Sequence, residues 1–242
     1  MSRLTFDQLI LEKFSEIEKK KLSEINERLI LSKNEPLYVI DNSINHATFN
    51  CKENIITLKD KNIFLSTLHE LLHAELIHFY KFPSLNKIKI ELKKHNLFRL
   101  KTTIINITND AHHFIFNERY LTLAEHLENV KLFSNQDDLL NPKFELNYLM
   151  KKINLKYDKH IRANFFYDKL YIPFKYKQLI RNNNVKWDAK SLKELDRELF
   201  EIIDCFFVKI SDLDIENNID NNENNIMKIY IQLFENLGKY IK

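Results

Sequence analysis

Only one glycine, Gly238, occurs among the 242 residues of the chain, and there are only four prolines. Tight hairpins and phosphate-binding loops usually need glycine, because its backbone reaches conformations that other residues avoid. The scarcity of glycine therefore favours a mainly helical protein. It also excludes the glycine-rich fingerprints with which many proteins bind nucleotides.

The remaining composition is that of a globular protein, with 44% hydrophobic and 29% charged residues. A net charge of +3 gives no strong electrostatic case for nucleic-acid binding. Cys51 and Cys205 are too few for a disulfide framework. Neither a signal-peptide pattern nor an apolar run of membrane-spanning length stands out, so we expect a cytoplasmic protein without membrane contact. The sequence does not indicate an oligomeric state.

Hydrophobic periodicity divides the chain into three regions. Residues 4–32 have helical spacing, which predicts an N-terminal helix within residues 1–35. Three short runs rich in β-branched and aromatic residues follow Pro36 and predict a small antiparallel sheet: "PLYVID", "HATFNC" and "NIITLKD". Residues 144–242 read mostly as helix, with the polar segment 216–225 as an exposed, flexible linker.

Between the sheet and this last region, the pattern predicts helices over about 61–80, 85–95 and 97–130. Asp60 is a plausible N-cap for the first of them. That helix is apolar on nearly every side, which predicts a central position in its domain. The expected fold class is α+β, mainly α: a domain over residues 36–135 and a helical region over 136–242 that could pack on the same core.

The first of these helices contains the sequence His-Glu-x-x-His. His69 and His73 are four residues apart, so both imidazoles project from one face and can reach the same Zn²⁺ ion. Glu70, beside them, could take a proton from an attacking water molecule and pass it to a leaving amine. A fortuitous motif would leave three polar side chains in an apolar helix without assigned partners, which is costly. A sheet followed by such a helix is the zincin arrangement, whose edge strand can hold an extended peptide.

A catalytic zinc site needs a third protein ligand and a fourth, open position. The helix over 97–130 carries four ligand-type residues in a short stretch: Asp110, His112, His113 and Glu118. We rank His113 first, because Asp110 lies one turn before it and could orient its ring. Glu118, His112 and His95 follow in that order. His78 lies about 180° around the helix from His69.

"HELLHAEL" followed by "NDAHHFIFNERYL" resembles the SprT-like group of zinc metallopeptidases, as a divergent bacterial member of this zincin-type group. The resemblance covers about residues 45–130. It implies a Zn²⁺ cofactor held by His69, His73 and His113, with Glu70 as the base. It also implies a peptide or protein substrate, including proteins associated with DNA. A gluzincin-like arrangement would instead use Glu118.

We therefore expect zinc-dependent peptide hydrolysis. The alternatives are a catalytically idle binding protein on a zincin scaffold and a helical interaction protein associated with nucleic acid. The aromatic and basic stretch 157–179 could line a groove or stack on single-stranded nucleic acid, although such spacing is more often a helix core. The candidates for stabilising an oxyanion are Tyr120, Tyr157, His160 and Tyr167.

Overall fold

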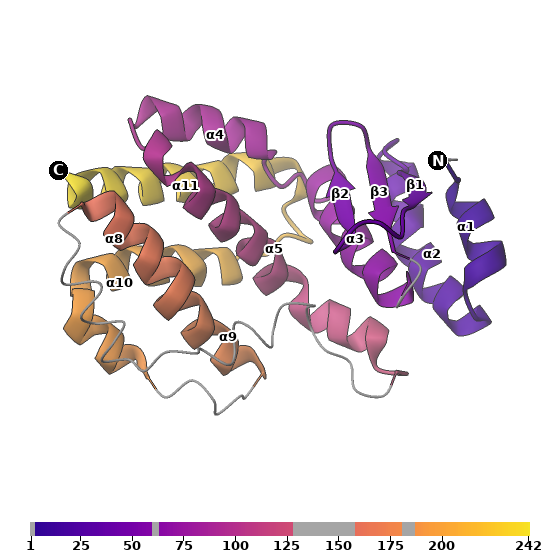
Figure 1. Cartoon of the computed structure of the whole chain (residues 1–242). Helices are drawn as coiled ribbons and strands as arrows, with labels where there is room; N and C mark the ends of the chain where they lie inside the picture. The colour runs from indigo at the N-terminus through magenta and orange to yellow at the C-terminus, as the bar shows by residue number, and fades with distance from the viewer. Residues whose placement is uncertain (1–2, 60–62, 128–157, 181–186) are drawn as a thin grey trace. The chain divides into compact units, whose positions relative to one another are not determined.

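A computed structural model of the chain describes residues 3–59, 63–127, 158–180 and 187–242. These residues form a mainly helical structure with one small sheet (Figure 1), in agreement with the predicted α+β, mainly α class. Two compact units alternate along the sequence. The sheet unit comprises Met1–Pro83, Ile115–Leu132 and Asp214–Asn224, and the helical unit comprises Ser84–Phe114, Phe133–Leu213 and Asn225–Lys242.

The N-terminal region contains two helices, α1 (Phe6–Lys13) and α2 (Glu16–Leu31), so the prediction of one continuous helix over residues 4–32 was wrong. The backbone is extended at Phe14, and α2 begins after Ser15. The backbone N–H of Ser15 donates to the Glu18 carboxylate at 2.8 Å, which completes a capping box. This Ser-x-x-Glu pattern starts a new helix even though the hydrophobic periodicity runs on.

The sheet is mixed, and the prediction of a wholly antiparallel sheet was wrong. It contains β1 (Leu37–Ile40), β2 (Thr48–Asn50) and β3 (Ile55–Leu58), in the order β1-β3-β2. Strands β2 and β3 form an antiparallel hairpin, closed at Asn54 with a positive φ of 53°. Strand β3 lies between the other two strands and pairs with β1 in parallel. Strand β2 is left at an edge of the sheet.

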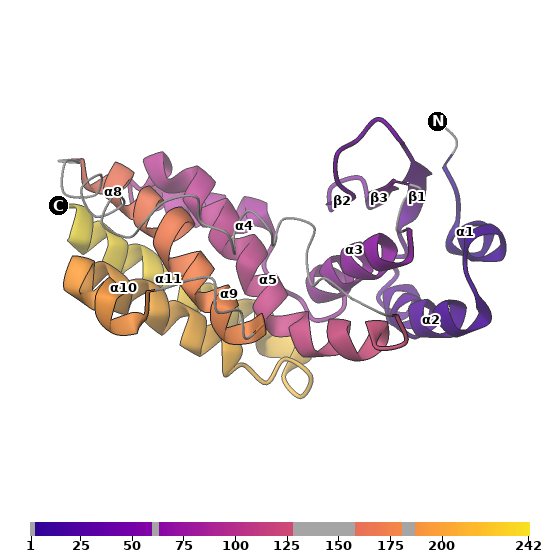
Figure 2. The same cartoon turned by 60° about the horizontal axis from the view of Figure 1, so that its bottom comes forward.

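Helix α3 (Ile63–His78) packs against β2, β3 and α2 inside the sheet unit, as Figure 2 shows. It agrees with the predicted helix over 61–80, while the proposed N-cap Asp60 lies outside the described residues. Apolar side chains on several of its sides are buried, including Leu68, Ala74 and Leu76. The helix is therefore central to its unit, as its apolar pattern indicated.

The helical unit is built from long helices around aromatic side chains. It contains α4 (Leu85–Lys94), the 3₁₀-helix η1 (Phe98–Leu100), the first half of α5 (Lys101–Ala124), α8 (Lys159–Phe166), the π-helix η2 (Tyr167–Tyr171), α9 (Ile172–Ile180), α10 (Ala189–Ser211) and most of α11 (Ile219–Ile241). The buried ring of Tyr230 packs on Phe206, and its hydroxyl donates to Thr108, so α11 contacts both α10 and α5. No helix among the described residues is long and apolar enough to cross a membrane.

The prediction of a linker over 216–225 was wrong, because α11 begins at Ile219. Asn222 is 1% exposed, and its amide donates to the backbone carbonyls of Tyr80 and Ile215. These two hydrogen bonds offset the cost of burying the amide. A strongly polar segment can therefore start a packed helix.

Candidate metal centre

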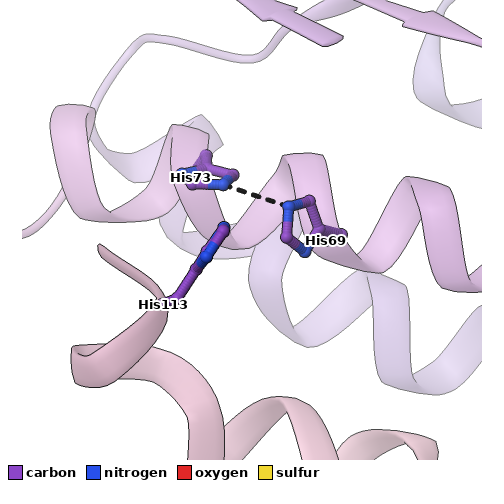
Figure 3. A group of neighbouring side chains, drawn as sticks. All are labelled: His69, His73 and His113. Carbon is purple, nitrogen blue, oxygen red and sulfur yellow. Dashed lines mark hydrogen bonds between the residues drawn. The ribbon is translucent and has the colours of Figure 1, made fainter. Parts of the chain in front are cut away.

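Helix α3 brings His69 and His73 together, as the His-Glu-x-x-His spacing predicted. Their Nε2 atoms lie 3.2 Å apart (Figure 3). Two nitrogen ligands on a tetrahedral Zn²⁺ ion, with Zn–N bonds of about 2.0–2.1 Å, are separated by about 3.3 Å. The two imidazoles thus already have nearly the separation that a shared zinc ion requires.

Helix α5 places His113 beside this pair. Ligand atoms of His69, His73 and His113 all lie within 4.8 Å of one another, and Figure 3 shows the ring of His113 pointing toward the other two. Among the described residues, these three histidines form the group that could hold a metal ion.

Phe116 explains why α5 lies against the two histidines of α3. Its ring packs edge-on against His69 and His73, with centroid distances of 5.7 and 5.1 Å. His113 precedes Phe116 by three residues on the same continuous helix, which puts the two side chains on one face about one turn apart. The packing of Phe116 therefore carries His113 to the site.

The other candidates for the third ligand have different surroundings and lie outside the group of three histidines. His112 is buried about 100° around α5 from His113. Glu118 is exposed. His95 ends α4, where it lies 3.5 Å from the Glu91 carboxylate and packs near the Phe234 ring. His78 packs edge-on against Phe49.

The protonation state of His69 suits metal binding. Desolvation lowers the pKa of His69 to about 4, so its imidazole is neutral at neutral pH. A histidine must be neutral to donate a lone pair to a metal ion. A set of three imidazole ligands is one that zinc accepts, and such a set leaves the fourth tetrahedral position open.

Glu70 lies beneath the edge strand β2. Its side chain is buried, and its carboxylate accepts a hydrogen bond from the backbone N–H of Phe49. Burial raises the pKa of Glu70 to about 8, against the opposing effect of that hydrogen bond. A carboxyl group whose pKa lies near neutrality is suited to accepting and releasing protons in a reaction.

The sequence suggested that Asp110 could orient the ring of His113, but Asp110 does not do so directly. Its Oδ1 lies 3.9 Å from Nδ1 of His113, too far for a hydrogen bond. The hydroxyl of Tyr176 bridges them, 2.8 Å from Asp110 Oδ1 and 2.9 Å from His113 Nδ1. Tyr167 donates to the other carboxylate oxygen at 2.6 Å. Sequence reasoning missed Tyr176, because no local pattern connects it with a helix about sixty residues earlier.

Glu75 is a second residue that sequence reasoning missed. Its buried carboxylate, two residues after His73, is paired with Arg28 of α2 at 3.1 Å and with Arg119 in the second half of α5. Arg28 also donates to the hydroxyl of Tyr80. The sequence did contain a signal for this ion pair, since an acidic residue in an otherwise apolar helix needs a partner when it is buried.

The candidate residues for stabilising an oxyanion have different surroundings. Tyr120 packs edge-on against His69, with centroids 6.1 Å apart, and burial raises its pKa to about 12. Tyr167 is engaged with Asp110, and His160 lies beside Asp158 at 3.3 Å. Tyr157 lies outside the described residues. Its contact with His69 keeps Tyr120 as a candidate for stabilising an oxyanion.

The stretch 157–179 forms core rather than an exposed aromatic surface, within its described part. Its buried residues include Phe166, Tyr167, Leu170, Tyr171 and Tyr176. Stacking of bases on these rings would require exposed faces. The structure therefore gives the nucleic-acid alternative no support from this segment.

Comparisons with known protein families, with curated proteins and with solved structures found no match to this chain. The function of the site therefore has to be inferred from the geometry and chemistry of its own residues.

Proposed function

We propose that the chain is a zinc-dependent metallopeptidase, with His69, His73 and His113 as metal ligands and Glu70 as the general base. The observation that supports this most is the convergence of three imidazoles from two helices, with ligand atoms within 4.8 Å of one another. His69 and His73 already have nearly the nitrogen–nitrogen separation of two ligands on one zinc ion, and imidazole is an ordinary ligand of zinc.

A bound Zn²⁺ ion would polarise the carbonyl of the scissile peptide bond and increase the acidity of a water molecule. Glu70 takes the proton from the attacking water and delivers it to the departing amine nitrogen. The N–H of Phe49 holds the Glu70 carboxylate in place beneath β2. Since β2 is an edge strand, its free side could align an extended peptide by main-chain hydrogen bonds.

The test is Glu70→Gln, which keeps the size of the side chain and an acceptor for the Phe49 N–H. We expect hydrolysis of an unfolded protein substrate to fall by about 10²–10⁴-fold, because the base is lost. Zinc content should stay the same, because Glu70 is not among the three ligands. Glu118→Gln, on the exposed side of α5, is the matched control and should keep full activity. Full activity of Glu70→Gln would refute the mechanism.

A structural zinc site on a catalytically idle scaffold is the second candidate. It is favoured by the burial of His73 and His113, each 7% exposed, since a substrate has to reach a catalytic metal. His69 is the partly exposed member of the three. The same experiment separates the two candidates: a structural site predicts full zinc content and no hydrolysis by the wild-type protein.

A further inference from the structure

The hydrogen bonds around His113 define which of its ring nitrogens carries a proton. The hydroxyls of Tyr167 and Tyr176 lie 2.6 and 2.8 Å from the two carboxylate oxygens of Asp110. An ionised carboxylate only accepts hydrogen bonds, so both hydroxyls donate to it. The oxygen of Tyr176 is then left to accept from Nδ1–H of His113 at 2.9 Å.

The opposite side of the His113 ring agrees with this assignment. The amide nitrogen of Asn109 lies 3.5 Å from Nε2 of His113. An amide NH₂ group donates and does not accept, so its approach is consistent with a lone pair on Nε2. A neutral imidazole protonated on Nδ1 presents its Nε2 lone pair to a metal.

The position of Tyr176 depends on an irregular helix that the sequence explains. Pro173 has no N–H, and its ring clashes with the carbonyl of the residue four positions before it in a regular α-helix. The chain widens into the π-helix η2, in which the N–H of Ile172 donates to the carbonyl of Tyr167, five residues back. Nine residues of regular α-helix would put Tyr167 and Tyr176 about 180° apart. The widened turn changes this angle, and both hydroxyls reach Asp110.

We propose that Tyr176 is a positioning residue for the metal site, which holds His113 with its proton on Nδ1 and its Nε2 lone pair available to the metal ion. This role rests on the proposed function, because it assumes that His113 is a ligand. Partners of this kind fix the orientation and tautomer of a ligand histidine, and their loss typically weakens metal binding about 10–100-fold. Tyr176 acts through His113 and does not itself touch the metal.

Tyr176→Phe tests the role, because it removes the hydroxyl and keeps the buried ring. We expect the dissociation constant for zinc, measured by competition with a chromophoric chelator, to rise about 10–100-fold. In the metal-free protein, long-range ¹H–¹⁵N NMR spectra should show His113 as the Nδ1–H tautomer in the wild type. The variant should show a mixture of both tautomers.

Tyr171→Phe is the matched control. Tyr171 ends the π-helix η2, five residues before Tyr176, and is also buried, but its hydroxyl donates to Asp204 at 2.8 Å, away from Asp110. This variant should leave the zinc affinity and the His113 tautomer unchanged. A Tyr176→Phe protein that matches Tyr171→Phe in both measurements would overturn the role.

The NMR measurement separates this proposal from the proposed function. Wild-type protein that binds no zinc refutes the zinc site, while the tautomer of the metal-free protein still decides whether Tyr176 sets the proton on His113. The wild-type spectrum is decisive even if a variant does not fold. An Nε2–H tautomer of His113 there would overturn the proposal.

Discussion

Arg119 of α5 donates to the carboxylate of Glu75 on α3, so an ion pair joins the two helices that carry the three histidines. Glu75 lies two residues after His73, and Arg119 lies six residues after His113. Arg28 from α2 binds the other carboxylate oxygen of Glu75. The packing of Phe116 and this ion pair together fix how the second half of α5 lies on α3.

Replacement of Glu75 by glutamine should therefore destabilise the sheet unit. Removal of one partner leaves two partly buried guanidinium groups uncompensated, and we expect a loss of about 2–4 kcal/mol in the free energy of unfolding. Urea denaturation measures this. The control is Glu16→Gln, which removes an exposed ion pair with Lys19 and should cost less than about 1 kcal/mol. Equal unfolding midpoints for the two variants would contradict the structural role of Glu75.

The three-histidine site makes a specific prediction about zinc affinity. His113→Ala should lose zinc nearly as completely as His73→Ala, because either change leaves only two ligands. His112→Ala and His95→Ala should largely retain it, since both residues lie outside the group. A titration with a metal indicator distinguishes these variants. If Glu118→Ala abolished zinc binding and His113→Ala did not, the site would be gluzincin-like and the assignment of His113 would be wrong.

Local patterns were sufficient to predict α3, α4 and most of α5, because their apolar residues recur with helical spacing. They also predicted that His69 and His73 share a face, which follows from four-residue spacing alone. The prediction of a wholly antiparallel sheet was wrong, because the strand order depends on where β3 enters the sheet. No local sequence pattern indicates that position. The Ser15 capping box was readable in the sequence, but the apolar periodicity across Phe14 concealed it.

The surroundings of the candidate site were harder to predict than the shared face of His69 and His73. Tyr176 reaches His113 across 63 positions of sequence, and its alignment depends on the π-helix before Pro173. Asn222 was assigned to a linker from its polar neighbours, yet two backbone carbonyls bind its amide. In both cases the partner comes from a distant segment. Propensity and periodicity contain no information about such partners.

Removal of zinc should lower thermal stability, because a metal ion at the proposed site would hold residues of α3 and α5 together and would bind only the folded chain. Metal present at about 1,000 times its dissociation constant adds about 4 kcal/mol to the stability. Addition of a strong chelator should therefore lower the melting temperature of the wild-type protein by several degrees, as followed by circular dichroism. His73→Ala should melt at the same temperature with and without the chelator. An unchanged melting temperature in the wild type would count against a bridging site.

Relative to Glu70→Gln, the metal-free wild-type protein should lose stability as the pH rises from about 5 to 8. Burial raises the pKa of Glu70 to about 8, above the value of about 4.3 expected in the unfolded chain. Between these values the folded state binds more protons than the unfolded state, so the free energy of unfolding falls with rising pH, by a few kcal/mol in total. Glu70→Gln has no such proton and should lack this decline.

Urea midpoints of both proteins at several pH values, with chelator present, measure this effect. Below pH 6.5 the lowered pKa of His69 acts in the opposite direction, because only the unfolded state gains its proton there. This contribution is common to both proteins and cancels in their comparison. If the urea midpoints of the wild type and Glu70→Gln changed identically with pH, the carboxyl group of Glu70 would not be buried away from water.

Zinc content is the measurement that tests the proposed site most directly. Protein purified without an affinity tag or chelator would be incubated with zinc, dialysed and analysed for metals. We expect about one zinc ion per wild-type chain and only trace amounts in a variant with both His69→Ala and His113→Ala. Trace zinc in the wild-type protein would contradict the assignment of these histidines as a metal site.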